Sequence, residues 1–128
     1  MNLQGLNSYR SVDTYARVGS ASPHELVRLL IDGLLARVNE ARGHLQRGEA
    51  GAKRDKIGRA LGIVEGLHMS LDKDRGGEIA ANLEQLYDYI ARALLRSNIE
   101  NAIEPLDEVA ELVRELKAGW DAIGSDLE

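Results

Sequence analysis

The 128-residue chain contains no cysteine, no phenylalanine and only two prolines. The absence of cysteine excludes disulfides and thiolate chemistry, and it is compatible with a reducing compartment. With one tryptophan and four tyrosines as the only aromatic residues, the core must be built from leucine, isoleucine, valine and alanine. No apolar run approaches the roughly 18 residues that a membrane span needs, and the first residues lack the pattern of a secretory signal. We therefore expect a cytoplasmic protein without membrane insertion.

Positive charge is also scarce. Lysine and arginine number 16 against 21 aspartates and glutamates, which gives a net charge of -5. Nucleic-acid binding requires a clustered positive surface, so we expect no nucleic-acid partner. The chain is 44% hydrophobic and 29% charged, a balance typical of a soluble globular protein. Its length fits one domain with one core.

The sequence contains no alternating, β-branched runs typical of strands, but it contains four segments with apolar residues at helical spacing. Short breaks separate these segments, so consecutive helices should be antiparallel. We expect an all-α, up-and-down four-helix bundle that forms a single domain over residues 22–123, followed by a C-terminal tail at 124–128. The predicted helices run from about Ser22 to Gly48, Ala52 to Leu71, Glu78 to Asn98 and Ile103 to Trp120.

Capping residues mark the helix starts. Ser22 is a good N-cap, Pro23 suits the first helical position, and Glu25 completes a capping box. Asn101 is predicted to cap the fourth helix, with Pro105 in its first turn. The apolar stripes predicted to face inward in the last two helices are Ile79, Leu83, Leu86, Tyr87, Ile90 and Leu94, and Leu106, Val109, Val113, Leu116 and Trp120.

Residues 1–21 differ from the rest of the chain. Leu6, Tyr9, Val12 and Tyr15 follow one another at three-residue spacing, and the loose sequence VGSAS comes next. This pattern fits a short amphipathic segment packed on the bundle. It also fits a frayed tail, which is the usual state of an N-terminus.

The second helix contains a row of glycines at four-residue spacing, Gly58, Gly62 and Gly66. Each glycine costs a helix interior about 1 kcal/mol relative to alanine. At 100° per residue the row lies opposite the apolar stripe, so it faces away from the core. The row is either a tolerated weakness on a solvated face or a shallow groove that another helix can approach closely.

The third helix has apolar residues outside its core stripe. Tyr89 and Leu95 both fall off the stripe, and together with the bare glycine row they indicate a surface that another chain covers. Leu83, Tyr87 and Leu94 lie on the stripe, so packing is their first role.

No pattern of catalytic or metal-ligating residues is present. His24, His44 and His68 are isolated and lack the spacing of metal ligands. There is no phosphate-binding glycine loop and no nucleophile elbow. Carboxylates of the fourth helix, such as Glu108 and Glu111, alternate with basic residues and predict a solvated face. We therefore expect neither an enzyme nor a cofactor.

Three stretches carry a resemblance to a known family. SASPHELVRLLIDG, LDKDRGGEIAANLEQLYDYIARALLRSN and EVAELVRELKAGW resemble, in that order, the signatures of the flagellar secretion chaperone family, FliS. The resemblance covers about residues 6–123. Its most specific part is GGEIAxNLxxLYDYI, read here at Gly76 to Ile90, because many polar and small positions match as well as the apolar pattern.

The resemblance implies a cytoplasmic helical bundle that binds the disordered C-terminal region of flagellin, keeps it monomeric and delivers it to the flagellar type III export gate. In the family an apolar residue and a tyrosine of the N-terminal segment cover part of the binding surface, and their counterparts here are Leu6 and Tyr9. The alternative is a regulatory bundle that forms a homodimer or binds another flagellar factor, such as an anti-sigma protein. The residues expected to contact a partner are Leu6, Tyr9, Val12, Gly62, Leu83, Tyr87, Tyr89, Ile90, Leu94 and Leu95.

Overall fold

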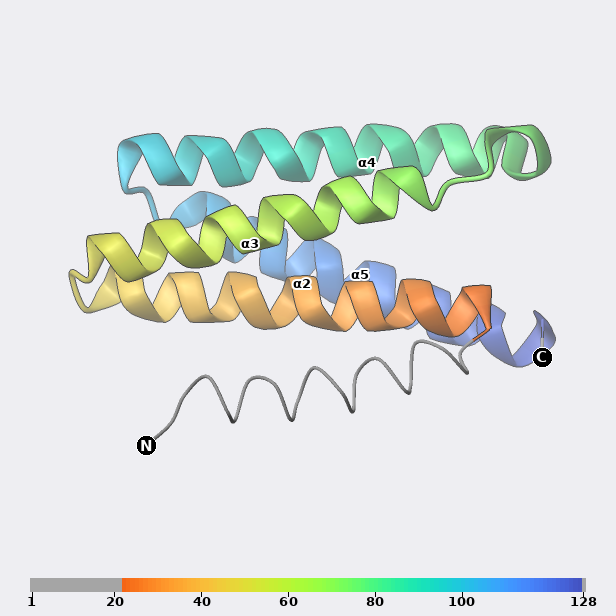
Figure 1. Ribbon diagram of the computed structural model, residues 1–128, viewed down its shortest axis with the longest axis horizontal. Helices are drawn as coiled ribbons and strands as arrows, with labels where there is room; N and C mark the ends of the chain where they lie inside the picture. Colours follow the sequence, from red (N-terminus) through yellow and green to blue (C-terminus); the bar gives the residue numbers. More distant parts are fainter. Residues whose placement is uncertain (1–21, 128) are drawn as a thin grey trace.

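A computed structural model describes residues 22–127, and these residues form four helices and no strand (Figure 1). This confirms the predicted all-α fold class. The N-terminal segment, residues 1–21, lies outside the described residues. The helices are α2 (Pro23–Gln46), α3 (Ala50–Met69), α4 (Lys73–Glu100) and α5 (Glu104–Leu127).

The four helices form a closed ring. Because each connection is only a few residues long, each helix runs antiparallel to the one before it. Each packs on its neighbours in the chain, and α5 returns to pack on α2 (Figure 1). One end of the bundle therefore collects the start of α2, the end of α3, the start of α4 and the end of α5.

The two predicted helix caps, Ser22 and Asn101, have different outcomes. Ser22 caps α2 as predicted, since its hydroxyl oxygen accepts a hydrogen bond from the Glu25 amide at 3.1 Å, with Pro23 at the first position. The prediction that Asn101 caps α5 is wrong. Asn101 instead ends α4 in the left-handed conformation, with φ 54°, a conformation that asparagine tolerates better than most residues.

The sequence DKDRGG does not simply interrupt the chain. Asp72 caps one helical turn, Lys73–Gly76, and the helical conformation breaks at Gly77, with φ 52° and ψ -124°. This region is essentially restricted to glycine. At Gly76 an added Cβ would lie 2.7 Å from the Ala80 Cβ, so the close turn requires both glycines.

The last helix is longer than predicted. It was expected to end near Trp120, with residues 124–128 as a tail, but α5 continues to Leu127. The residues after Trp120 include no proline, so no residue there blocks the backbone hydrogen bonds of a helix. A single glycine, Gly124, weakens a helix but does not end it.

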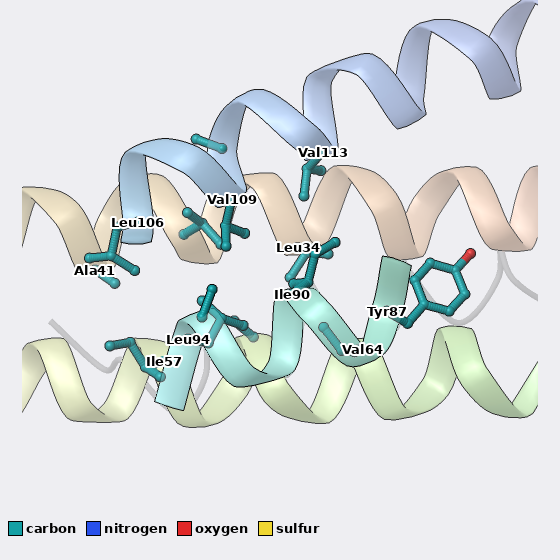
Figure 2. Packing of buried hydrophobic residues seen from close by; sticks show 14 of the residues in the cluster. Leu34, Ala41, Ile57, Val64, Tyr87, Ile90, Leu94, Leu106, Val109 and Val113 are labelled. Carbon is teal, nitrogen blue, oxygen red and sulfur yellow. The ribbon is translucent and has the colours of Figure 1, made fainter. Parts of the chain in front are cut away.

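The core lies along the axis of the bundle and is aliphatic apart from one tyrosine, as the composition predicted (Figure 2). Tyr87 lies at the edge of the cluster, with its ring buried and its hydroxyl directed away from the other side chains. Burial raises the pKa of Tyr87 to about 12. The most deeply buried aliphatic side chains are Ile31, Leu34, Val38, Ile57, Ile90, Leu94, Leu106, Val109 and Val113.

One residue predicted to face inward does not. Ile79 is 66% exposed. The Nε2 atom of His68 on α3 lies 3.2 Å from the Oδ1 atom of Asp88 on α4, so these two positions are neighbours. Ile79 precedes Asp88 by nine residues, which correspond to about 13 Å of helix. Since α3 ends at Met69, the start of α4 extends beyond α3, and none of the four described helices covers Ile79.

A lysine is buried at the opposite end of the bundle. Lys53 is fully buried, and its Nζ donates to the Asn98 carbonyl at 3.0 Å and to the Asn101 Oδ1 at 2.6 Å. These bonds connect the start of α3 to the end of α4. Desolvation, followed by the nearby charge of Arg54, lowers the pKa of Lys53. The helical spacing places Lys53 on the apolar stripe of α3, four residues before Ile57, but a lysine is expected at the surface.

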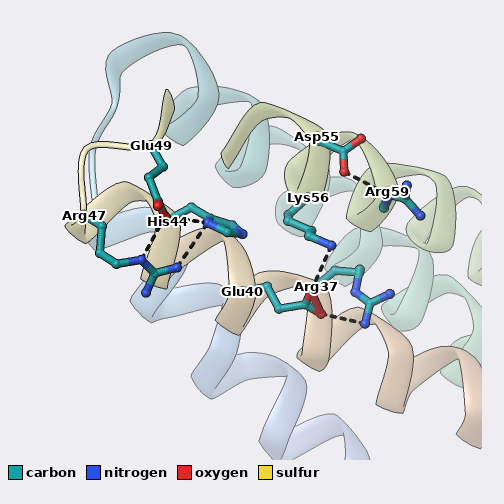
Figure 3. A network of polar contacts seen from close by, with 8 residues as sticks. All are labelled: Arg37, Glu40, His44, Arg47, Glu49, Asp55, Lys56 and Arg59. Carbon is teal, nitrogen blue, oxygen red and sulfur yellow. Dashed lines mark hydrogen bonds and ion pairs between the residues drawn. The ribbon is translucent and has the colours of Figure 1, made fainter. Parts of the chain in front are cut away.

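Ion pairs line the seam between α2 and α3 (Figure 3). The carboxylate of Glu40 lies 2.6 Å from Arg37 on its own helix and 3.1 Å from Lys56 on α3. Burial raises the pKa of Glu40, but hydrogen bonds and charge from Lys56 and Arg37 outweigh this effect, and the net pKa is lowered from its ordinary value of 4.5. Glu40 therefore favours the folded state while it is ionised.

We expect Glu40→Gln to lower the free energy of unfolding by less than about 1 kcal/mol at pH 7, because the pair is partly solvated. The carboxylate stabilises the fold above its ordinary pKa of 4.5, and this contribution disappears as the pH falls through the lowered value of the folded state. The difference between the two proteins, measured by urea unfolding, should therefore vanish near pH 3. Asp55→Asn serves as a control because Asp55 pairs only within α3, with Arg59 at 3.1 Å. A difference that persists at pH 3 would contradict this prediction.

Candidate functional site

A large apolar depression lies at the end of the bundle where α4 extends beyond α3. We call it the end groove. Its volume is about 570 Å³. The apolar lining consists of Leu71, Ile79, Ala80, Leu83 and Trp120, and the rim consists of Ser70, Asp72, Arg75 and Gly76.

A second depression adjoins the end groove, and we call it the side hollow. It has a volume of about 350 Å³ and is formed mainly by the first turns of α2. Ser70 and Trp120 line both depressions, so the indole is a wall that they share. The remaining lining residues of the side hollow are Pro23, His24, Leu26 and Val27.

The end groove lies where three helix termini leave apolar side chains partly accessible. The two glycines before Ile79 break the helical conformation inside α4, and the turns of α4 that follow them extend past α3. Trp120 comes from the last turns of α5 and lies across from them. Large apolar side chains that remain accessible in a concave surface are typical of binding sites for apolar groups of a partner.

Among the described residues predicted to contact a partner, only Leu83 lines the end groove. Tyr87, Ile90 and Leu94 belong to the core, with exposed fractions of 1%, 0% and 0%. Direct contact between a partner and these three residues would require the helices to separate. Their packing role, which the sequence favoured for Tyr87 and Leu94, is the one that the structure displays.

Three other predicted contact residues lie on the outer surface, away from the end groove. Gly62 is exposed on α3, and an added Cβ there would meet no atom within 4 Å. Tyr89 and Leu95 on α4 are 43% and 46% exposed, and at 100° per residue they lie about 120° apart around the helix. These residues do not form one patch with each other or with Leu83.

The side chain of Tyr89, a residue of α4, contacts α5. Its hydroxyl donates a hydrogen bond to the Glu108 carboxylate of α5, and this bond raises the pKa of Tyr89. The predicted contact residues Leu6, Tyr9 and Val12 lie outside the described residues.

The sequence pattern missed Ile79 and Trp120 as lining residues of the end groove because both fall on apolar stripes. Two signals could have identified them. Ile79 lies two residues after the double glycine at 76–77, near the start of a helix, where a neighbouring helix does not always extend far enough to cover it. Trp120 follows Gly119 near the end of the last stripe, where side chains have fewer helices to pack against.

The described residues show no second kind of site. They contain no group of three histidine, aspartate or glutamate side chains that could hold a metal ion. His68 is partly buried, with its ring edge-on to Tyr87 at 5.5 Å between centroids. Over this same part of the chain no helix is long and apolar enough to cross a membrane.

Comparison with known proteins identifies the family. The family model described as "Flagellar protein FliS" matches residues 5–127. The flagellar secretion chaperone FliSB of Pseudomonas aeruginosa is 42% identical over 121 residues, which are 94% of this chain and 96% of the relative. The flagellar secretion chaperones FliS of Salmonella typhimurium and Vibrio cholerae are 38% and 36% identical, over 93% and 92% of this chain and 89% and 87% of their own lengths. The chain therefore belongs to the FliS family of flagellar secretion chaperones, as its sequence motifs predicted.

Proposed function

We propose that this chaperone binds the disordered C-terminal region of flagellin in the cytosol and anchors it in the end groove. Bound in this way, flagellin stays monomeric and competent for type III export, and the complex is delivered to the flagellar export gate. The protein acts by binding alone, without catalysis or a cofactor. The observation that carries this proposal is an accessible apolar groove, with Ile79 66% exposed, on a member of a flagellar secretion chaperone family.

The chemistry of the groove suits an amphipathic segment. Such a segment buries its apolar face in a groove and leaves its polar face in water, and the end groove offers aliphatic side chains and an indole inside a polar rim. Occupying the apolar face of flagellin would also remove the surface through which its subunits associate. Ordering a disordered segment costs about 2–5 kcal/mol, so a long contact is expected.

A long contact would extend beyond the end groove. We propose that the predicted contact residues on the outer surface, Gly62, Tyr89 and Leu95, contribute there. The first two offer different kinds of contact. Gly62 leaves the α3 backbone open to close approach, and Tyr89 offers a ring with a polar tip.

The direct test is to mix the protein with full-length flagellin and, separately, with flagellin that lacks its C-terminal segment. Size-exclusion chromatography should show co-elution with the first and not with the second. Filament growth of full-length flagellin, followed by light scattering, should stop at a one-to-one ratio. Equal binding to both flagellins would contradict the proposed segment, and unchanged filament growth would contradict the proposed role.

We further propose that residues 1–21 act as a displaceable lid through Leu6, Tyr9 and Val12. This segment joins the described chain at Ser22, and the next two residues, Pro23 and His24, line the side hollow. The point where the segment is attached therefore lies beside the side hollow. A tethered occupant competes with flagellin at a high effective concentration.

We expect Tyr9→Ala to strengthen flagellin binding by about three- to tenfold, because a larger fraction of molecules then presents an open groove. The free energy of unfolding should change by less than about 0.5 kcal/mol. Isothermal titration calorimetry and urea unfolding measure the two quantities, and Tyr15→Ala is the matched control within the same segment. A large loss of stability with unchanged affinity would make Tyr9 a structural residue and not part of a lid.

A regulatory dimer, or a complex with another flagellar factor such as an anti-sigma protein, is the second candidate. The observation that favours it is a separate apolar surface on α4, where Leu95 is 46% and Ile99 80% exposed. Sedimentation velocity at micromolar concentrations tests the dimer. A monomer at all concentrations would reject it, and this result would not affect the flagellin proposal.

A further inference from the structure

Trp120, the only tryptophan of the chain, is held by an unusual set of contacts with one residue of α2. Its indole stacks on the imidazole of His24, with ring centroids 4.8 Å apart and planes 8° from parallel. The indole Nε1 donates to the His24 carbonyl at 3.0 Å, and His24 Nε2 donates to the Trp120 carbonyl at 2.9 Å. The two residues lie 96 positions apart in sequence, so these contacts join the first turn of α2 to the late part of α5.

These contacts restrict the indole in complementary ways. The stack sets the plane of the ring, and the bond from Nε1 sets its rotation within that plane. The bond from Nε2 to the carbonyl also fixes the imidazole, because a carbonyl accepts and this nitrogen must then carry the proton. A partly buried tryptophan near a helix end, without such contacts, would have several rotamers available.

The position of the indole decides the shape of both depressions, since Trp120 lines each of them. A different rotamer of the indole would therefore change the shape of both depressions. A large aromatic side chain held in advance contributes most to binding, because little freedom remains to be lost when the partner arrives.

We infer that His24 is a positioning residue that holds Trp120 in place as the wall shared by the end groove and the side hollow. This inference deepens the proposed function and rests on it for the role of the groove. His24 would affect binding of the partner through the Trp120 side chain. The histidine also couples the groove to the point where residues 1–21 join the bundle.

The first test uses the free protein. Because the chain has one tryptophan, its indole bands in near-ultraviolet circular dichroism, which depend on a fixed asymmetric environment, report on this position alone. We expect His24→Ala to reduce these bands by more than half while the helical signal in the far ultraviolet stays unchanged. His44→Ala is the matched control, because His44 lies at the other end of α2 and bonds to Glu49. Unchanged indole bands in His24→Ala would overturn the inference.

The second test is a double-mutant cycle on binding of a peptide with the sequence of the flagellin C-terminal segment. We expect His24→Ala to weaken binding about five- to tenfold in the natural background and less than about twofold in a Trp120→Leu background. An equal effect in both backgrounds would show that His24 acts independently of Trp120 and would overturn the inference. If Trp120→Leu itself binds like the natural protein, the proposed groove is wrong, whereas a strong effect of Trp120→Leu with none from His24→Ala contradicts only the positioning role.

Discussion

Replacing Ile79 with aspartate is expected to weaken binding of the flagellin C-terminal segment at least about 30-fold, with no loss of stability. The side chain is 66% exposed in the free protein, so the substitution leaves no cavity in the core. Burying an isoleucine on binding contributes about 1.5–3 kcal/mol, and a carboxylate in the same place adds a desolvation cost. Titration calorimetry with the peptide measures the affinity, and urea unfolding measures the stability.

Ile99→Asp is the matched control for this prediction. Ile99 lies on the same helix and is 80% exposed, but it is 20 residues further along α4, or about 30 Å. We expect this variant to weaken binding less than about threefold. Equal losses in the two variants would show that the end groove is not the anchor for flagellin.

The largest expected effect on stability comes from Tyr87→Ala, which should lower the free energy of unfolding by about 3–5 kcal/mol. The ring is 1% exposed and packs in the aliphatic core, where the smaller side chain would leave a cavity. Its ring also meets the edge of His68 at 5.5 Å, and this contact would be lost as well. For a domain of this size, such a loss is a large part of the total stability. Urea unfolding followed by far-ultraviolet circular dichroism provides the measurement.

Tyr89→Ala, two residues further on, separates burial from residue type. Tyr89 is 43% exposed and makes its polar contact with Glu108 at the surface, so we expect a cost below about 1 kcal/mol. Tyr87→Phe should be close to the natural protein because the hydroxyl points away from the core. Comparable losses for Tyr87→Ala and Tyr89→Ala would mean that the stripe predicted from the sequence does not define the core.

The sequence predicted the fold well because each helix carries its own signal. Apolar residues recur at helical spacing, Ser22 and Pro23 mark a start, and the short connections leave only antiparallel neighbours. The errors lie where the outcome depends on a neighbouring helix. Asn101 suits a helix start and a helix end equally, and its left-handed φ of 54° is set by how α4 turns into α5. A lysine is expected at the surface, and Lys53 can be buried only because the end of α4 supplies acceptors for its ammonium group.

The candidate site was less predictable for a related reason. A stripe shows which side of a helix is apolar, but it does not show how far the neighbouring helices extend. Ile79 therefore looked like a core residue, although α3 ends before it can cover this side chain. Trp120 does pack against the core, but its stripe gave no sign that it also lines a groove. The residues predicted from exposure on their own helix, Tyr89 and Leu95, are indeed exposed, but they lie apart from the groove. The contact between His24 and Trp120 spans nearly the entire chain, and no local pattern indicates it.

The buried Lys53 gives the two poles of the bundle different resistance to local opening. At its pole an ammonium group held by the Asn98 carbonyl and the Asn101 side chain cannot be released without exposing unsatisfied acceptors. The opposite end of the bundle holds the accessible end groove. Backbone amides near Asn98 should accordingly exchange with deuterium more slowly than those near Ile79. The end of the bundle that holds the end groove can therefore open locally while the opposite end keeps the four helices in register.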